Sequence, residues 1–468
     1  MLHVSTRGEA PPLGFTEAML AGLARDGGLY VPERWPTLSS DEIAGFAGRP
    51  YADVAKAVLG RLIDGEVPSA VLDRAVEASY AAFRHPAVCP LVQIGDNLFM
   101  LELFHGPTLA FKDVAMQLLG RLMDQALKAR GGRATIVGAT SGDTGSAAVA
   151  AFSGLDQVDV FILFPHDRVS EVQRRQMTSM DAPNVHALAV EGTFDDCQAL
   201  VKALFNHANF RDEVQLSGVN SINWARVAAQ AVYFFTAAAS LGAPHRPVSF
   251  SVPTGNFGDV LAGSVAKRMG LAVERLMVAT NANDILPRTF ATGRYEVRVV
   301  EPTTSPSMDI QVSSNFERLL FEVHDRDGIA VRRHMQSLAQ SGAFAIPPEP
   351  LARLRDEFRG EAVPEPEVMS EIAAVRRNAG YLLDPHTAVG VRAARSLLRE
   401  DPRTPVVALA TAHPAKFPEA VERACGVRPG LPPHLADLLS RRERFTVVPN
   451  DPTAIEGHVR ARSRAVRG

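Results

Sequence analysis

A lysine at position 112 stands out because it places an amine nucleophile on the apolar face of a predicted helix. The segment Phe104–Asp113 reads F-H-G-P-T-L-A-F-K-D and leads into a periodic pattern that predicts a helix to about Arg130. At 100° per residue, every position on the face of Lys112 is apolar: Ala115, Met116, Leu119, Leu122, Met123, Ala126 and Leu127. Lys112 is therefore predicted to point inward.

Two interpretations of this lysine remain open. A lysine in the first turn of a helix can extend its stem and reach solvent. If the ammonium instead faces a dry interior near a helix N-terminus, desolvation and the helix dipole lower its pKa. That shift would supply the free amine that Schiff-base chemistry needs. Lys112 is therefore a candidate nucleophile.

Two glycine-rich turns each follow a predicted strand and precede a predicted helix. The first reads G-A-T-S-G-D-T-G at Gly138–Gly145, and the second reads T-G-N-F-G-D at Thr254–Asp259. Backbone N–H groups and the helix dipole favour an anion at such turns. Neither turn has a P-loop or dinucleotide pattern, and the first alone could be an ordinary capped turn. Together with an amine, they suggest sites for a cofactor phosphate and a substrate carboxylate.

A third group of polar residues ends another predicted strand. Ala410–Pro418 reads A-T-A-H-P-A-K-F-P and follows the apolar run Pro405–Thr411. Ligands of parallel sheets usually bind at the carboxyl ends of the strands. The alternative is that Thr411 only terminates the strand while His413 and Lys416 lie in a solvent-facing loop.

These groups must be positioned by an α/β fold, because short apolar runs alternate with amphipathic segments beyond residue 130. The predicted buried strands are Ala134–Gly138, Val158–Phe164, Val185–Val190, Pro247–Val252 and Pro405–Thr411. We expect a helical cap over residues 1–95, a small Rossmann-like domain over 131–225, and a large α/β domain from 96–130 and 226–468. The proline-flanked segment 347–366 is interpreted as a surface insertion.

Composition favours small-molecule chemistry in the cytoplasm. The 468 residues are 46% hydrophobic and 22% charged, and the formal net charge of −3 gives no basic field for nucleic acid or anionic lipid. Three widely spaced cysteines form neither a disulfide framework nor a metal motif, as expected in a reducing compartment. We read no signal peptide and no membrane-spanning segment.

The motifs, taken in chain order, resemble the threonine synthase family. They are F-H-G-P-T-L-A-F-K-D, A-T-S-G-D-T-G, S-I-N-W-A-R, P-T-G-N-F-G-D, S-S-N-F-E-R-L-L and H-P-A-K-F, joined by S-T-R and G-L-A-R-D-G-G-L-Y-V-P near the N-terminus. The resemblance weakens only beyond about Val427. It implies the tryptophan synthase β-like fold of pyridoxal-phosphate enzymes (fold type II). The implied reaction turns O-phospho-L-homoserine and water into L-threonine and phosphate, the last step of threonine biosynthesis, in a monomer or weak homodimer.

The resemblance also implies a role for each motif residue. Lys112 would bind pyridoxal 5'-phosphate as a Schiff base, Asp143 would lie beside the phenolic oxygen, and Thr411 would meet the pyridine nitrogen. The residues implied to bind phosphate and carboxylate groups are Thr254, Gly255, Asn256, Phe257 and Gly258 for the cofactor phosphate, Ser141, Gly142 and Thr144 for the substrate carboxylate, and Arg226, Arg318 and Lys416 for the substrate phosphate.

Two other functions remain open at this point. One is a threonine synthase-like phospho-lyase that uses the same lysine and loops but releases phosphate and 2-oxobutyrate. The other is a small-molecule sensor that kept the fold and lost the chemistry. The presence of Lys112 together with both loops argues against the sensor, whereas only the product distinguishes synthase from lyase.

Overall fold

Two β-sheets form the framework of the chain in a computed structural model that describes residues 1–466. In spatial order, the larger sheet consists of β13 (Phe358–Ala362), β10 (Val273–Thr280), β9 (Val248–Pro253), β14 (Val406–Ala410), β4 (Leu98–Glu102) and β3 (Leu91–Gly95). The smaller sheet consists of β15 (Thr446–Val448), β7 (Val185–Val190), β6 (Val158–Pro165), β5 (Ala134–Ala139) and β8 (Leu216–Ser217). Only β3 runs antiparallel to its neighbour within these two sheets.

The central strands are buried along their whole length, which explains why the sequence shows them as continuous apolar runs. Every residue of β6, β9 and β14 is buried. The five strands predicted from the sequence are confirmed as β5, β6, β7, β9 and β14. The sequence prediction did not include β3, β4, β10 and β13.

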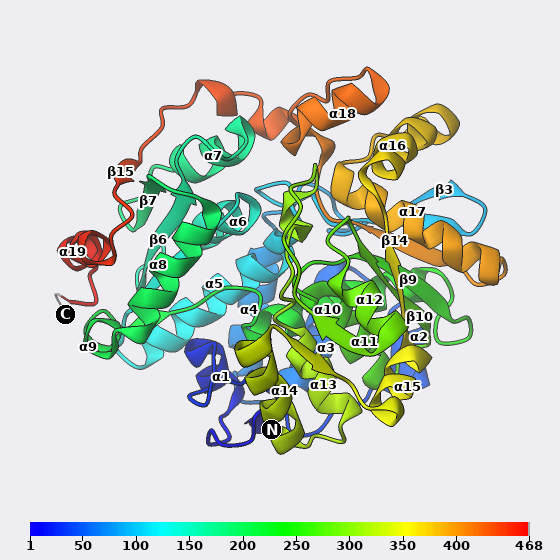
Figure 1. The fold of residues 1–468 in the computed structure, drawn as a ribbon, viewed down its shortest axis with the longest axis horizontal. Helices are drawn as coiled ribbons and strands as arrows, with labels where there is room; N and C mark the ends of the chain where they lie inside the picture. The colour runs from blue at the N-terminus through cyan, green and yellow to red at the C-terminus, as the bar shows by residue number, and fades with distance from the viewer. Residues whose placement is uncertain (467–468) are drawn as a thin grey trace.

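Helices cover both sheets, and Figure 1 shows the small-sheet domain on the left and the large-sheet domain on the right. Helix α5 (Lys112–Ala129) contacts helices on both sides, α6 and α10. The helices beyond α5 are α6 (Asp143–Phe152), α7 (Glu171–Thr178), α8 (Phe194–Asn206), α9 (Ala208–Glu213), α10 (Trp224–Ser240), α11 (Gly258–Arg268), α12 (Ile285–Thr292), α13 (Phe316–Val323), α14 (Gly328–Ser341), α15 (Pro348–Glu357), α16 (Glu365–Ala379), α17 (Pro385–Glu400), α18 (Pro418–Cys425) and α19 (Pro452–Arg462). Within residues 1–466, each helix is too short or too polar to cross a bilayer.

The N-terminal region is mainly helical and carries one small antiparallel pair of strands. Its elements are β1 (His3–Ser5), α1 (Phe15–Ala21), β2 (Tyr30–Pro32), α2 (Ser40–Ala44), α3 (Tyr51–Ile63) and α4 (Ser69–Tyr80). Helix α3 packs on α10 and α4 packs on α5. A second two-stranded sheet, β11 (Arg294–Glu296) with β12 (Ala343–Ala345), lies in the large domain.

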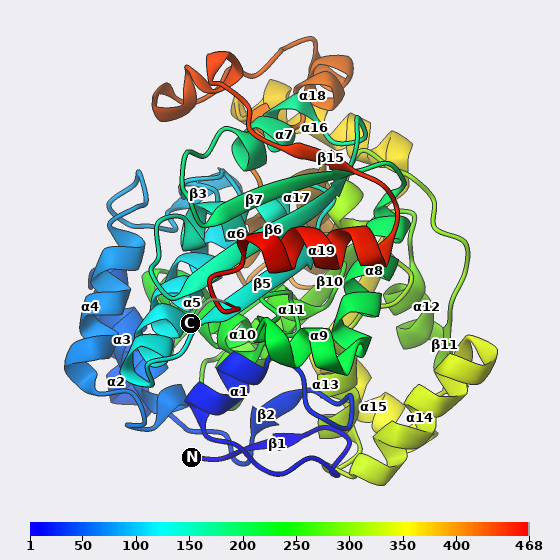
Figure 2. The same cartoon turned by 90° about the vertical axis from the view of Figure 1, so that its left-hand side faces the viewer.

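The C-terminal segment returns to the small sheet, which corrects the assignment of all of residues 226–468 to the large domain. Strand β15 pairs in parallel with β7, and Figure 2 shows α19, in red, crossing in front of the small-sheet strands. Ile455 and Val459 of α19 belong to the same buried cluster as Leu200 of α8. The Oγ1 of Thr135 and the Oγ of Ser463 are 2.7 Å apart. These contacts anchor the chain end to the domain that begins near residue 131.

The interpretation of residues 347–366 as a surface insertion is also wrong. Residues Phe358–Ala362 form β13, which pairs in parallel with Leu276–Thr280 at the edge of the large sheet. Phe358 is buried, whereas the four residues that follow it alternate between half-buried and exposed. An edge strand of this kind has a weak apolar signal because much of it faces solvent.

Candidate active site

Lys112 is held at the start of α5 by contacts on either side of it. The Asp113 carboxylate accepts hydrogen bonds from the Thr108 backbone N–H and hydroxyl, both at 2.7 Å. The backbone N–H of Phe111 donates to the carbonyl of Thr411 at 2.8 Å, at the carboxyl end of β14. Lys112 itself is only 9% exposed. The prediction of an inward-facing lysine is confirmed.

The electrostatics of the site lower the pKa of the Lys112 amine. Burial lowers the pKa of Lys112, the nearby Asp143 carboxylate opposes this effect, and the charges of Arg226 and Lys416 lower the pKa further. The Lys112 Nζ and Asp143 Oδ2 atoms are 3.6 Å apart. Because this separation is longer than a normal hydrogen bond, the carboxylate only partly offsets the cost of burying the ammonium.

Asp143 lies in the first turn of α6 and remains ionised. Burial alone would raise its pKa, but the charges of Lys416 and Lys112 outweigh burial and hold the pKa well below its ordinary range. Its Oδ1 atom is 2.9 Å from the Lys416 Nζ and accepts a hydrogen bond of 2.9 Å from the Gln173 amide. The site therefore contains a fixed negative charge between two lysines.

Lys416 is completely buried, and protein atoms accept hydrogen bonds from its ammonium. Besides contacting Asp143, the Nζ donates to the Thr108 carbonyl at 2.7 Å and to the Gln176 side-chain oxygen at 2.9 Å. An ammonium has three N–H donors, so these three contacts use all of them. The resemblance implied contact with the substrate phosphate, but the structure commits Lys416 to other partners.

The first glycine loop joins β5 to α6. Gly142 precedes the helix with a φ of 140°, and a Cβ at this position would lie 2.3 Å from the Gln173 side chain. The Thr140 hydroxyl accepts hydrogen bonds of 2.9 Å from the backbone N–H groups of Gly142 and Gly145. Ser141 and Thr144 are half-buried on either side of Gly142 and Asp143. Only glycine fits the conformation and space at position 142.

The second loop joins β9 to α11 and has the properties of an anion cradle. Thr254 directly follows the strand, Phe257 has a φ of 62°, and Gly258 begins the helix. Among the described residues, no acceptor contacts the backbone N–H groups of residues 255–258. The loop carbonyls point to other partners, because Asn256 O accepts from Asn315 and Gly255 O accepts from Ser313. This leaves a run of free N–H donors at a helix N-terminus, as a phosphate site requires.

Arg318 lies behind this loop, where it is 1% exposed. Its Nε donates to Tyr30 O at 3.0 Å, one Nη donates to the Asn315 side chain, and the other donates to Ile222 O at 2.6 Å. Its guanidinium also lies over the Trp224 ring. The implied role of Arg318 in holding the substrate phosphate is therefore corrected, because its donors are used inside the protein.

Arg226 and Thr411 retain donors that the protein does not fully use. Arg226 is 3% exposed and donates to Val219 O at 3.3 Å, but its Nε has no partner among the described residues. Burial lowers the pKa of Arg226. The Thr411 side chain is buried at the end of β14, and its hydroxyl makes no hydrogen bond within the described part of the chain.

Three residues that the sequence did not single out form a chain of contacts that begins at Lys112. Ser307 places its hydroxyl 3.4 Å from the Lys112 Nζ, and its backbone N–H donates to His386 Nε2 at 3.3 Å. His386 in turn contacts Asp384 through Nδ1 at 2.7 Å. The only local sequence signal for these residues is D-P-H at Asp384–His386, which is typical of a helix start. It gives no information on how far these residues lie from Lys112.

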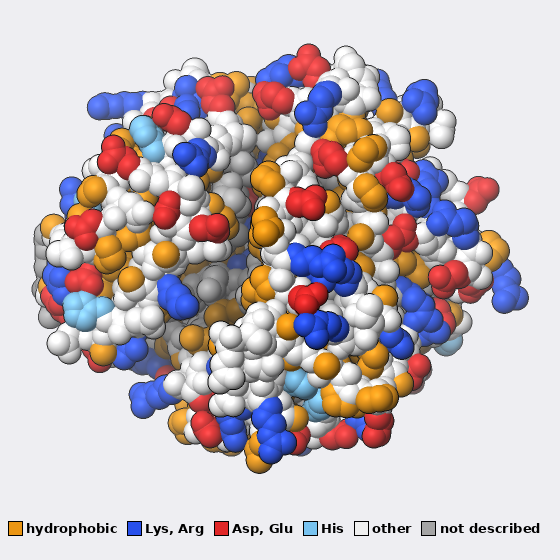
Figure 3. All heavy atoms as spheres, viewed as in Figure 1, with side chains coloured by type: hydrophobic (Ala, Val, Ile, Leu, Met, Phe, Trp, Pro, Cys, Tyr) orange, Lys and Arg blue, Asp and Glu red, His pale blue; other side chains and the backbone are white. Residues whose placement is uncertain are grey.

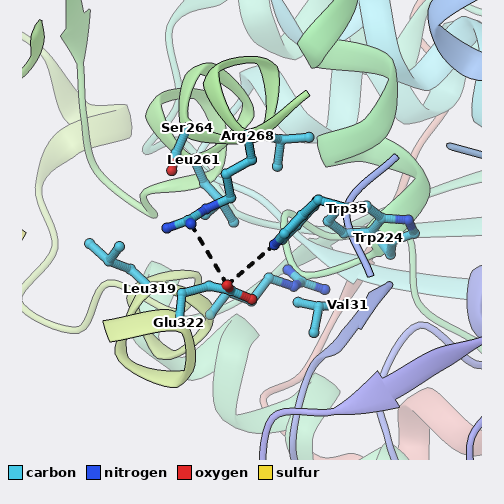
Figure 4. A pocket seen from close by; sticks show the side chains of 10 residues that line it. Val31, Trp35, Trp224, Leu261, Ser264, Arg268, Leu319 and Glu322 are labelled. Carbon is cyan, nitrogen blue, oxygen red and sulfur yellow. Dashed lines mark hydrogen bonds and ion pairs between the residues drawn. The ribbon is translucent and has the colours of Figure 1, made fainter. Parts of the chain in front are cut away.

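The surface is hollowed between the two domains, as the space-filling view in Figure 3 shows. A separate cavity lies against α11 and is lined by Trp35, Trp224, Leu261 and Glu322 (Figure 4). Its volume is about 10 Å³, room for one water molecule. This cavity is too small for a cofactor or substrate.

Comparison with known proteins agrees with this site. Family models described as threonine synthase N terminus, pyridoxal-phosphate dependent enzyme, and threonine synthase C-terminal match residues 2–80, 89–339 and 387–459. A threonine synthase from Pseudomonas aeruginosa is 53% identical over 98% of each chain. A threonine synthase-like 2 protein from Pongo abelii is 34% identical over 95% of this chain and 93% of its own.

Solved structures show the same relationship. A threonine synthase with bound pyridoxal phosphate from Brucella melitensis is 60% identical and covers 99% of this chain and 100% of its own, with a TM-score of 0.96. The yeast threonine synthase is 38% identical over 98% of each chain, with a TM-score of 0.93. The predicted fold class is thus confirmed, and the chain belongs to the threonine synthase family of pyridoxal-phosphate-dependent enzymes.

Proposed function

We propose that this chain converts O-phospho-L-homoserine and water into L-threonine and phosphate, with pyridoxal phosphate bound at Lys112. The observation that carries the proposal is the position of the Lys112 amine, which is buried and lies next to Asp143 of the first glycine loop. Family membership supports the same reaction. The product distinguishes this proposal from the phospho-lyase alternative.

The residues around Lys112 fit the cofactor. The free N–H groups of residues 255–258 suit its phosphate, with Thr254 at the start of the turn, and the unpaired hydroxyl of Thr411 suits the ring nitrogen. Asp143 supplies a fixed charge near the reacting groups. When bound, pyridoxal phosphate supplies an electron sink for the carbanion formed next to the substrate amine.

Lys112 has the properties of the group that binds the cofactor and moves protons. Because burial lowers its pKa, a larger fraction of Lys112 is the free amine near neutral pH. A free amine can accept the proton from the substrate Cα and later return it. The surrounding charges of Asp143, Arg226 and Lys416 set how readily that proton is held.

The substrate anions are assigned to two places. We propose that Ser141, Gly142 and Thr144 hold the carboxylate, because they form the turn at the N-terminus of α6. Arg226 is proposed for the phosphate, because its Nε lacks a protein partner and its charge acts on Lys112. Lys416 is instead proposed to hold Asp143 as its counter-ion.

We also propose a cytoplasmic monomer or weak homodimer without nucleic-acid or membrane partners. Support comes from the net charge of −3 and from three cysteines that are all free: Cys89, Cys197 and Cys425. Size-exclusion chromatography with light scattering measures the oligomeric state directly.

The deciding experiment gives O-phospho-L-homoserine to the purified chain and assays phosphate, threonine and 2-oxobutyrate separately. Equal amounts of phosphate and threonine support the synthase, whereas phosphate with 2-oxobutyrate supports the lyase. The Lys112→Ala variant should lose both activity and the absorbance of covalently bound cofactor. Lys128→Ala is the matched control, because Lys128 is an exposed lysine on the same helix. Failure of the wild-type chain to bind cofactor would contradict both the synthase and the lyase proposals.

A further inference from the structure

The Ser307 hydroxyl lies beside both the Lys112 amine and the Asp143 carboxylate. It is 3.4 Å from Lys112 Nζ and 3.5 Å from Asp143 Oδ2, while the amine and the carboxylate are 3.6 Å apart. A hydroxyl can accept one hydrogen bond and donate another. Ser307 can therefore accept from the amine while it donates to the carboxylate, which adds a second link beside the loose ion pair of 3.6 Å.

His386 fixes Ser307 from the opposite side. The Ser307 backbone N–H donates to His386 Nε2 at 3.3 Å, so this nitrogen acts as an acceptor and carries no proton. The ring proton must then lie on Nδ1, which faces Asp384 Oδ2 at 2.7 Å. Asp384 is itself fixed at the start of α17, where it accepts from the backbone N–H groups of His386 and Thr387. The imidazole is thus held in one tautomer and one orientation.

The segment that carries Ser307 is anchored at its base by a second set of hydrogen bonds. Asp309 accepts from the Thr303 N–H at 2.9 Å and hydroxyl at 2.7 Å, and from the Asn281 amide at 2.8 Å. At its tip, the Ser307 carbonyl lies against Gly255, where a Cβ would come within 2.8 Å of it. The segment therefore connects the second glycine loop to Lys112.

We propose that Ser307 is a positioning residue for the Lys112 amine and that His386, oriented by Asp384, holds Ser307 in place. This inference rests on the proposed function, in which Lys112 binds the cofactor. Without the hydroxyl, Asp143 Oδ2 loses a hydrogen-bond donor, and its 3.6 Å ion pair with Lys112 can shorten. A closer carboxylate favours the ammonium, so less free amine would be present at neutral pH.

The charged groups around Lys112 determine the direction of this effect. Asp143 on α6 raises the Lys112 pKa, whereas Arg226 on α10 and Lys416 after β14 lower it. His386 on α17 would lower the pKa of Asp143 only if its ring were protonated, and the tautomer described above is neutral. Of these groups, only Asp143 attracts the ammonium more strongly as it moves closer to Lys112. Loss of Ser307 should therefore shift the amine toward its protonated form.

The test follows covalent capture of pyridoxal phosphate by the apoenzyme, measured by absorbance across a pH series. Ser307→Ala should move the pH midpoint of capture upward by about one unit, which makes capture at pH 7 about tenfold slower. Ser307→Thr keeps the hydroxyl and should stay close to wild type. Ser307 is half-buried, so a single missing hydroxyl leaves the fold intact, which circular dichroism checks.

A double-variant cycle tests the role of His386. His386→Leu should shift the midpoint in the same direction as Ser307→Ala, and the double variant should shift it no further, because His386 acts through Ser307. His386→Gln keeps an acceptor and should partly restore capture. A wild-type midpoint in Ser307→Ala, or fully additive shifts in the double variant, would overturn the inference. Capture that survives in Lys112→Ala would instead overturn the proposed function.

Discussion

Replacing Lys416 with methionine leaves the Asp143 carboxylate buried without its closest cation. The Nζ and Oδ1 atoms are 2.9 Å apart, and at an effective dielectric constant near 20 their attraction is about 6 kcal/mol. Lys112 and the Gln173 amide remain as partners and offset part of this loss. Removing one partner of a buried ion pair typically costs about 3–5 kcal/mol, which is a large share of a stability of about 5–15 kcal/mol.

Urea unfolding of the apoenzyme at pH 7 measures this loss. Lys202→Met is the control, because Lys202 is an exposed lysine on α8 whose loss should change stability by less than about 0.5 kcal/mol. Adding Asp143→Asn to Lys416→Met removes the unpaired charge and should recover part of the stability. The reasoning is refuted if the double variant is no more stable than Lys416→Met alone, because the penalty would then not come from the buried carboxylate.

Three further changes test other parts of the structure. Burial raises the pKa of Asp259 to about 7, so the unfolded chain loses this proton at lower pH than the folded chain. The free energy of unfolding should therefore fall by up to about 4 kcal/mol as the pH rises from near 4 to near 7. Urea titrations should show that Asp259→Asn removes this fall. Gly142→Ala places a Cβ 2.3 Å from Gln173 at a φ of 140° and should cost about 1–3 kcal/mol and weaken substrate binding, whereas Gly457→Ala, in open space on α19, should not destabilise. Arg318→Lys keeps the charge but loses the planar guanidinium with its several donors, so it should speed cofactor loss in dialysis. A raised KM for substrate with unchanged cofactor retention would instead indicate that Arg318 binds the substrate phosphate.

The parts of this site that the sequence predicted are those with a local pattern. Lys112 was found because the apolar positions around it repeat with the period of a helix, and both glycine loops were found because each lies between a strand and a helix. The central strands were equally visible, since burial on both faces makes their residues uniformly apolar.

The parts that were missed depend on which distant segments the fold brings together. Ser307 lies 195 residues beyond Lys112, and nothing near either residue indicates their contact. Strand β15 has only three residues, two of them exposed, so it has no apolar run to detect. Arg318 shows a different limit: its charge suggested a phosphate ligand, but only coordinates reveal that backbone carbonyls use its donors.

Two lysines share one carboxylate in this site, and their different contacts explain which of them can react. Lys416 is fully enclosed and has three acceptors for its three N–H groups, so the protein stabilises its ammonium form. The Lys112 Nζ lies 3.6 Å from the same carboxylate and 3.4 Å from the Ser307 hydroxyl, so these contacts only weakly offset the cost of burying its ammonium. The positive charge fixed on Lys416 makes a second ammonium nearby still less favourable. Lys416 therefore lowers the pKa of both groups: it keeps Asp143 ionised and increases the fraction of Lys112 that is the free amine.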